Sequence, residues 1–173
     1  MGHYAIRREY DEEGRNRKII FLGIDREPIL NSNGYASEIR TFDDRGNIVT
    51  EHYYDEQGEP VRTNSFGYGC YKEYDGRNRN VLLAYLGNDD KPTVTAQGFA
   101  IAFRVYYEEE NLEGFIKEEY YFDQDHQPAI LQNGQSAVRM EYDRFGRTAV
   151  TTFLDAAGNP TSRSEERFSR NAE

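Results

Sequence analysis

Residues 41–60 read TFDDRGNIVTEHYYDEQGEP, and this stretch contains nearly the same phrase twice. An aromatic residue is followed by Asp, two variable positions and Gly, first at Phe42 and again at Tyr54. Asp at the first turn position accepts hydrogen bonds from the backbone amides that follow it, and Gly at the fourth tolerates the left-handed conformation that closes a hairpin. The stretch therefore predicts two tight chain reversals with a short strand between them.

Three sets of residues repeat with the same spacing outward from this stretch. The five prolines follow one another at steps of 32, 32, 36 and 32 residues: Pro28, Pro60, Pro92, Pro128 and Pro160. Two aromatic series keep the same period: Tyr10, Phe42, Tyr74, Tyr106 and Tyr142, and Phe21, Tyr53, Tyr85, Tyr121 and Phe153. The four extra residues fall between Tyr106 and Tyr121, within or beside the segment EEENLEGF. A shared period and a shared insertion predict a tandem array of about five units.

We expect one repeat domain over residues 1–173. Its units cover approximately residues 8–40, 41–72, 73–104, 105–140 and 141–168. The last unit is expected to act as a partial cap, and residues 169–173 are expected to form a frayed tail.

Each unit has three turn signals. The first is the Asp-x-x-Gly turn of residues 11–14, 43–46 and 143–146, with Asn78 in the Gly position of the third unit. The second precedes the periodic proline and has Arg26, Asp90 and His126 in the Gly position of three copies. The third is marked by NGYA (33–36), FGYG (66–69), QGFA (97–100) and NGQS (133–136). Asn is the residue after Gly that best tolerates positive φ, so Asn78 is expected to be left-handed.

The segments between the turns read as short strands. Arg79, Val81, Leu83 and Tyr85 alternate on one face, and no segment keeps a helical period over three turns. The predicted fold is all-β, with tandem hairpins in an elongated or spiralling antiparallel sheet; a β-solenoid is the alternative. An isolated hairpin is marginal in water, so neighbouring units must bury one another's aromatic faces. We expect each aromatic series to form a ladder, every ring lying on its equivalent in the next unit.

Composition excludes several classes of function. The net charge of -10 repels phosphate backbones, so no nucleic-acid binding is expected. No apolar run approaches the ~20 residues that span a bilayer, and no signal peptide is evident. A lone Cys70 excludes an internal disulfide and a cysteine-rich metal cluster. As it stands the chain is expected to be cytoplasmic, or at the cell surface or secreted if it is part of a larger protein.

The turn sequences carry a family resemblance. The run Arg-x-aromatic-Asp-x-x-Gly-(Asn/Arg), at residues 8–15 and 40–47, resembles the YD repeats of the Rhs family, and RMEYDRFGR (139–147) is the nearest copy. The resemblance covers residues 8–160. It implies a ribbon of hairpins, which in that family spirals into shells around toxins or serves in cell-surface adhesion. The unit of 32 residues with a proline-marked second turn departs from the shorter YD spacing.

Residues able to carry chemistry are scattered. His3, His52 and His126 have no ligand spacing to one another or to Cys70, which is expected to be a packing residue. Clustered turn carboxylates such as Asp123 and Asp125 could bind calcium, but they do not fit a calcium loop and more simply support their turns. We expect no enzyme activity, no metal and no cofactor.

The leading functional hypothesis is a non-catalytic repeat module for protein–protein interaction or scaffolding, as part of a larger bacterial surface or toxin-type protein. One alternative is a carbohydrate- or cell-envelope-binding module, in which the third-turn aromatics Tyr35, Tyr68 and Phe99 stack on sugar faces. A second alternative is a fragment of an Rhs-like toxin-associated shell. The expected partner is therefore a protein or a glycan.

Overall fold

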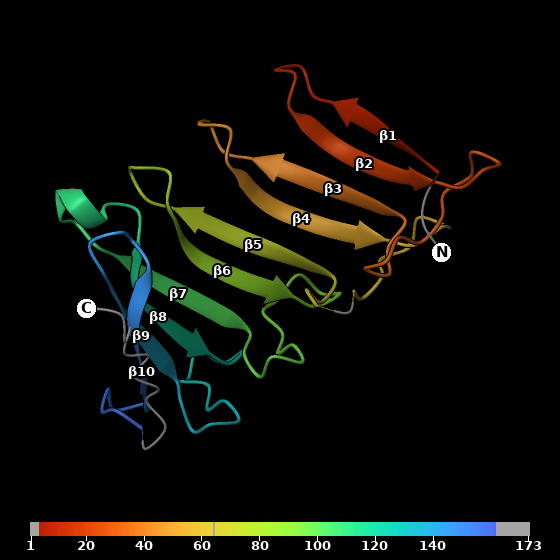
Figure 1. The fold of residues 1–173 in the computed structure, drawn as a ribbon. Coiled ribbons are helices and arrows are strands. Elements are labelled where there is room, and N and C mark those ends of the chain that lie inside the picture. Colours follow the sequence, from red (N-terminus) through yellow and green to blue (C-terminus); the bar gives the residue numbers. More distant parts are fainter. Residues whose placement is uncertain (1–3, 64, 162–173) are drawn as a thin grey trace, which may run out of the picture.

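A computed structural model describes residues 4–63 and 65–161, and these residues form one antiparallel sheet of ten strands. Neighbours in the sequence are neighbours in the sheet throughout, so the chain runs back and forth from β1 at one end to β10 at the other (Figure 1). The predicted all-β array of hairpins in an antiparallel sheet is confirmed. The end of the fifth unit, the predicted tail at residues 169–173 and His3 lie outside the described residues.

The strands come in five similar pairs, with one short 3-10 helix. Their bounds are β1 (Ala5–Tyr10), β2 (Asn16–Leu22), β3 (Ser37–Phe42), β4 (Ile48–Tyr54), β5 (Gly69–Tyr74), β6 (Asn80–Leu86), β7 (Ile101–Tyr106), η1 (Glu110–Leu112), β8 (Ile116–Phe122), β9 (Ala137–Tyr142) and β10 (Thr148–Leu154).

Pairing within a hairpin is twice as extensive as pairing between hairpins. Each hairpin has six residue pairs, whereas adjacent hairpins share three, such as Lys18, Ile19 and Ile20 of β2 with Ile39, Glu38 and Ser37 of β3. The hairpin tips therefore project beyond the inter-hairpin ladders along one side of the sheet, and the long connections lie along the other (Figure 1).

The tight turns form for the reason that their residues predict. In the second unit, the Asp43 carboxylate accepts hydrogen bonds from the amides of Arg45 and Asn47, and Gly46 is left-handed with φ of 85°. Asn78 takes the same conformation at 61°, as predicted. The second turns have positive φ even where Gly is replaced, at Arg26, Asp90 and His126. A register shift next to each hairpin turn marks a β-bulge.

The four-residue insertion lies in the fourth hairpin turn, within the predicted interval. A backbone hydrogen bond from Tyr107 to Phe115 closes this turn, where the third unit closes from Asp75 to Arg79. The intervening residues include η1 and the left-handed Gly114. The insertion therefore lengthens one tip and leaves the period of the strands intact.

Side chains join the hairpin tips where the backbones do not pair. The hydroxyls of Tyr74, Tyr106 and Tyr142 each donate to the carbonyl oxygen of the first residue of the preceding hairpin's second strand. The acceptors are Ile48, Asn80 and Ile116, at 2.8–2.9 Å. We call this repeated contact the tyrosine clasp. The second unit has Phe42 at this position and lacks the hydroxyl. Three of the five residues in the first aromatic series are thus held by hydrogen bonds to the neighbouring unit, and the ring-on-equivalent-ring stacking that the sequence predicted is not found among them.

The second aromatic series does form a ladder, but a mixed one. Rings of the strands alternate with rings of the third turns, with centroids 4.7–6.4 Å apart, in the order Phe21, Tyr35, Tyr53, Phe66, Tyr85, Phe99 and Tyr121. Equivalent strand rings are two hairpin strands apart, too far to touch directly, so a third-turn ring fills each gap. The prediction that each ring lies on its equivalent is corrected accordingly.

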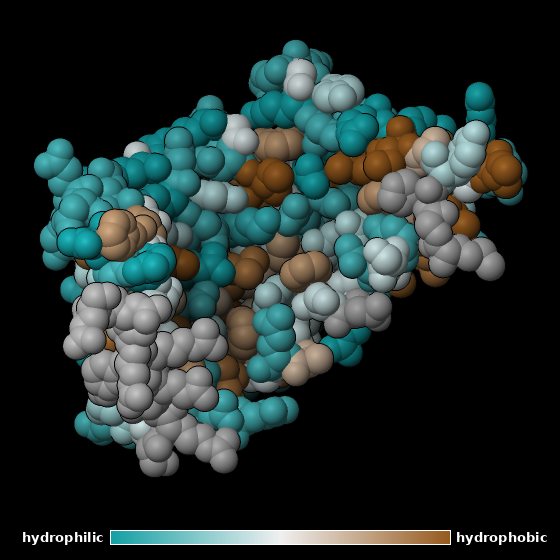
Figure 2. Space-filling view, in the orientation of Figure 1, coloured by the Kyte–Doolittle hydropathy of each residue, from teal (hydrophilic) through white to brown (hydrophobic). Residues whose placement is uncertain are grey.

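The sheet has two unlike faces. The ladder face carries Tyr53, Cys70, Tyr85 and Ala102, and the third turns fold over it. The reverse face carries residues such as His52, Ala84 and Ile101, together with half-exposed side chains. Figure 2 shows hydrophilic residues over much of one side of the molecule, with hydrophobic residues gathered over its hollowed middle. Among the described residues, no helix is long and apolar enough to cross a membrane.

Candidate functional site

Two of the three predicted binding aromatics are interior. Tyr35 and Phe99 are 7% and 8% exposed, and both are rungs of the mixed ladder. The Tyr35 hydroxyl donates to the buried Glu38 carboxylate, which leaves it little freedom to meet a ligand. These two rings therefore hold neighbouring hairpins together.

Tyr68 occupies a different place from the other two. Its amide donates to the carbonyl oxygen of Leu86, just as the amides of Ala36 and Ala100 donate to Tyr54 and Phe122. Tyr68 is thus equivalent to buried alanines, and Gly67 is equivalent to Tyr35 and Phe99. An alignment of the third turns by residue similarity places Tyr68 against Tyr35, which is one residue out of register. The 32-residue period places Gly67 against Tyr35, as the structure does.

The second unit keeps its ladder by using another ring. Phe66 stands where the other units have a left-handed Gly, and its ring lies 6.4 Å from Tyr53 and 6.2 Å from Tyr85. Gly67 beneath it has φ of 68°, and a Cβ there would lie 2.6 Å from the carbonyl oxygen of Leu86. The exchange leaves the Tyr68 ring outside the ladder and partly exposed.

A groove on the reverse face begins beside Tyr68. A pocket of about 220 Å³ is lined by His52, Tyr53, Tyr54, Pro60, Tyr68, Gly87, Asn88 and Asp90. A second hollow of about 340 Å³ is lined by Thr50, His52, Tyr71, Ala84, Leu86, Asp90 and Pro92. Because His52 and Asp90 line both, the two hollows are adjacent across the second and third units, and we refer to them together as the groove. Each hollow has room for a side chain or a sugar ring.

The two polar residues shared by the pockets bind each other. His52 Nε2 lies 2.9 Å from the Asp90 carboxylate, which comes from the second turn of the next unit. The equivalents of His52 are Ile20, Ala84, Tyr120 and Thr152, so only the second unit of the described chain has an imidazole here. The Asp90 side chain is 74% exposed and keeps oxygen atoms available to a ligand. Asp90 is also left-handed, at a position where two other units have Gly.

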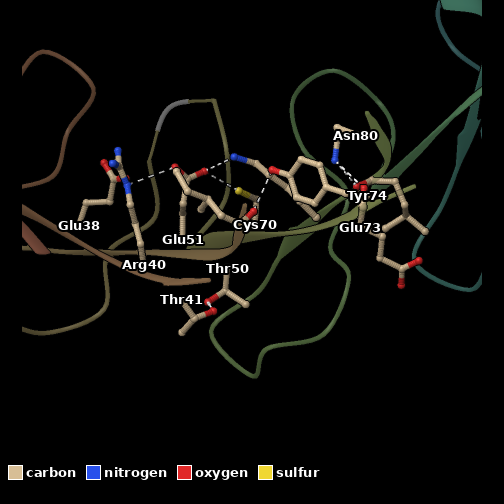
Figure 3. A network of polar contacts seen from close by, with 12 residues as sticks. Glu38, Arg40, Thr41, Thr50, Glu51, Cys70, Glu73, Tyr74 and Asn80 are labelled. Carbon is tan, nitrogen blue, oxygen red and sulfur yellow. Dashed lines mark hydrogen bonds and ion pairs between the residues drawn. The ribbon is translucent and has the colours of Figure 1, made fainter. Parts of the chain in front are cut away.

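Another polar cluster lies on the ladder face, where it is mostly buried (Figure 3). Arg40 binds the carboxylates of Glu38 and Glu51, and Lys72 also binds Glu51. Burial raises the pKa of Glu38, and Arg40 only partly offsets this. Burial alone would also raise the pKa of Glu51, but its bonds to Lys72 and Cys70 outweigh it and lower that pKa. Because each carboxylate is held by a cation, the cluster joins β3, β4 and β5 and offers no unpaired base.

Cys70 belongs to this cluster as a hydrogen-bond donor. Its thiol lies 3.1 Å from a Glu51 carboxylate oxygen and is buried. Burial, together with the negative charge of Glu51, raises the pKa of the thiol to about 12. The thiolate needed for nucleophilic attack is therefore scarce near neutral pH, in keeping with the predicted packing role.

The remaining candidates stay apart. Within residues 4–63 and 65–161, no group of three or more His, Cys, Asp or Glu side chains could hold a metal ion. His126 lies at the left-handed position of its turn, and the Asp123 carboxylate accepts hydrogen bonds from the amides of Asp125 and Gln127. The structure therefore brings together Tyr68, His52 and Asp90, of which sequence reasoning assigned only Tyr68 to binding.

Comparisons with known proteins give no assignment. No protein-family model matches the chain, and a search of curated proteins found no match. The resemblance to YD repeats of the Rhs family therefore stays a prediction.

Proposed function

We propose that the chain is a non-catalytic binding module that holds a segment of a protein partner in the groove beside Tyr68. The observation that carries this proposal is a coincidence of two features. The repeat is broken at Phe66, Gly67 and Tyr68, and the groove opens at the same place. Departures from a locally consistent pattern concentrate at functional positions, where selection for binding outweighs selection for stability.

The chemistry of the groove favours a basic segment. Asp90 offers an exposed carboxylate, and the partly exposed Tyr68 ring offers a π face. An Arg or Lys side chain can use both, through a charge-assisted hydrogen bond and a cation–π contact. The net charge of -10 attracts basic partners over longer distances and speeds their encounter.

A displayed library of random peptides tests this proposal. We expect selection on the wild-type chain to enrich peptides with Arg or Lys beside an apolar residue. Tyr68→Ala should weaken their binding at least about tenfold, which corresponds to about 1.4 kcal/mol. Tyr4→Ala is the matched control, because Tyr4 makes the equivalent amide contact with Leu22 but is remote from the groove in the sheet order. Peptides that bind both variants equally, or no enrichment at all, would contradict the proposal.

A saccharide is the second candidate, favoured by the polar side chains around one partly exposed ring. Asn88, Asp90 and His52 can exchange hydrogen bonds with sugar hydroxyls while the Tyr68 ring stacks on the sugar face. A glycan array separates the two candidates. Specific sugar binding that is lost in Tyr68→Ala and kept in Tyr4→Ala would support the saccharide and not the peptide.

A further inference from the structure

The contact between neighbouring hairpins is repeated four times and has three recurring parts. The first three residues of an odd strand pair with the preceding even strand. The aromatic near the end of the odd strand makes the tyrosine clasp or its Phe42 counterpart. The side chain of a residue just after one hairpin turn, such as Arg15 or Arg79, contacts the turn of the following hairpin. Each contact therefore needs one half from each of two adjacent hairpins.

The forward reach is clearest for Arg15 and Arg79. Each donates to a backbone carbonyl oxygen in the next hairpin turn, that of Asp43 or of Tyr107, at 3.3 Å. Each guanidinium also lies 4.9 Å from the centre of the next aromatic ring, Phe42 or Tyr106. The fourth unit replaces the arginine with Phe115, whose ring lies 4.7 Å from Tyr142.

The free edge of β1 carries one unused half of this contact. Ile6 is 36% exposed, although its equivalents Glu38, Cys70, Ala102 and Val138 are all 8% exposed or less. Tyr10 is 59% exposed, although its equivalents Tyr74, Tyr106 and Tyr142 are clasped. Among the described strands, β1 pairs only with β2. The edge is thus shaped like the internal ones, and no hairpin of the described residues covers it.

The last hairpin carries the other unused half. Arg147 is equivalent to Arg15 and Arg79, and it likewise binds the Asp of its own turn, Asp143. Its side chain is 68% exposed, compared with 30% for Arg15 and 15% for Arg79. The carbonyl oxygen of Thr148 stands at the position that accepts the tyrosine clasp in earlier units. Among the described strands, β10 pairs only with β9.

We propose that β1 of one copy docks on β10 of a second copy and continues the internal contact between chains. The equivalent register pairs Ala5, Ile6 and Arg7 of one copy with Thr152, Thr151 and Val150 of the other. The Tyr10 hydroxyl then donates to the Thr148 carbonyl oxygen, and Arg147 covers the Tyr10 ring. The occupant is a second copy because this chain itself supplies both halves at the spacing that the contact needs.

The contact is head-to-tail and does not close on itself in a pair. A dimer keeps one free β1 edge and one free β10 edge, so further copies add in the same way. Two β1 edges paired with each other would instead bring Arg7 and Arg8 of both copies together. That arrangement would also leave both Tyr10 hydroxyls without a carbonyl acceptor.

Sedimentation velocity on the full chain, over a wide range of concentration, tests the proposal. The wild type is expected to form dimers and longer species as concentration rises. Tyr10→Ala and Arg147→Ala should each raise the dissociation constant at least about tenfold, since each removes one half of every contact. An equimolar mixture of the two variants should regain a dimer and nothing longer, because only one intact edge remains on each. Ile130→Ala, at another exposed apolar residue, should associate like the wild type.

Milder variants guard against loss of folding. Tyr10→Phe removes only the hydroxyl, and Arg147→Lys keeps the charge; both should weaken association while circular dichroism stays unchanged. A chain that is monomeric at every concentration overturns the proposal. So does association that depends on Tyr10 but not on Arg147, which would indicate a symmetric β1 pair. Tyr68→Ala should leave association intact, so this inference and the groove proposal can fail separately.

Discussion

The third turns of the second and third units occupy equivalent places in the sheet but expose different residues. In the third unit, Gly98 is left-handed, Phe99 fills the ladder and Ala100 is fully buried. In the second unit, Phe66 supplies the ladder ring from one position earlier, and Tyr68 replaces the alanine. The ladder thus tolerates a ring delivered from a neighbouring position. That tolerance lets one unit present a tyrosine at the groove without breaking the sheet.

The difference separates residues that build the fold from residues that are free to bind. Ladder residues that follow the period, such as Tyr53, Tyr85 and Phe99, are buried between hairpins, where their rings stabilise the sheet. Tyr68, which departs from the period, instead lines the groove beside His52 and Asp90. Equivalent substitutions in the two turns are therefore expected to have unlike effects.

The largest contrast is expected between Phe99→Ala and Tyr68→Ala. Removing the buried Phe99 ring leaves a cavity between Tyr85 and Tyr121 and should lower the free energy of unfolding by about 3–5 kcal/mol. Tyr68→Ala restores the residue found in two other units and should cost less than about 1 kcal/mol. Urea denaturation measures both, and equal losses would remove the distinction between the two turns.

Alanine substitutions at Gly58 and Gly67 test how closely the backbone packs at the third turn of the second unit. Gly58→Ala meets no atom within 4 Å and should cost about 1–2 kcal/mol, since only the left-handed conformation is strained. Gly67→Ala has the same strain and would also place its Cβ 2.6 Å from the Leu86 carbonyl oxygen. We expect it to cost about 3 kcal/mol. A loss for Gly67→Ala no larger than that for Gly58→Ala, in the same denaturation assay, would contradict the close packing of this turn.

A gain of stability is expected where the ladder stops. Gln135 holds the position of Tyr35 and Phe99 in the fourth unit, and its buried Oε1 has no hydrogen-bond partner. Gln135→Phe should place a ring beside Tyr121 and remove an unpaired oxygen atom. The free energy of unfolding should rise by about 1–2 kcal/mol, read from a higher urea midpoint at an unchanged slope. Gln132→Phe, at the exposed start of the same turn, is the control and should give no gain.

The smallest effect concerns the tyrosine clasp. Phe42→Tyr should add a hydrogen bond to the carbonyl oxygen of Asn16, and Tyr74→Phe should remove the one to Ile48. Each should change the free energy of unfolding by about 0.5–1.5 kcal/mol, with opposite signs. Thermal unfolding of the two variants measures both changes in stability. Changes of the same sign would mean that the hydroxyl does not stabilise the contact between tips.

Much of the architecture can be predicted from the spacing alone. The prolines and aromatics give the number of units and the place of the insertion, because each unit must meet its neighbour in the same register. The Asp and Gly of the turns give the chain reversals, and Asn78 keeps its turn left-handed in place of Gly. These features are local or strictly periodic, so a single sequence contains them.

The candidate site cannot be predicted from neighbouring residues in the sequence or from the 32-residue repeat. His52 and Asp90 are 38 residues apart, and they meet because the second turn of the third unit reaches β4 of the second unit. Burial also departs from side-chain size: Phe103 is 41% exposed, and its small neighbour Ala102 is 1% exposed on the ladder face. The buried face of the sheet is the one that the third turns fold over. The alternation of side chains along a strand assigns residues to two faces, but it does not show which of the two faces the turns cover.

One measurement tests the central claim most directly. It is the free energy of unfolding of a chain in which the third turn of the second unit is given the sequence of the same turn in the third unit. The four changes Ser65→Gln, Phe66→Gly, Gly67→Phe and Tyr68→Ala give residues 65–68 the sequence of residues 97–100. We predict a folded chain that is as stable as the wild type, or more stable by up to about 1–2 kcal/mol, because the ladder keeps one ring here and that ring moves to the position it has in the third unit. A loss of more than about 2 kcal/mol would mean that SFGY is there for stability, and would contradict the account.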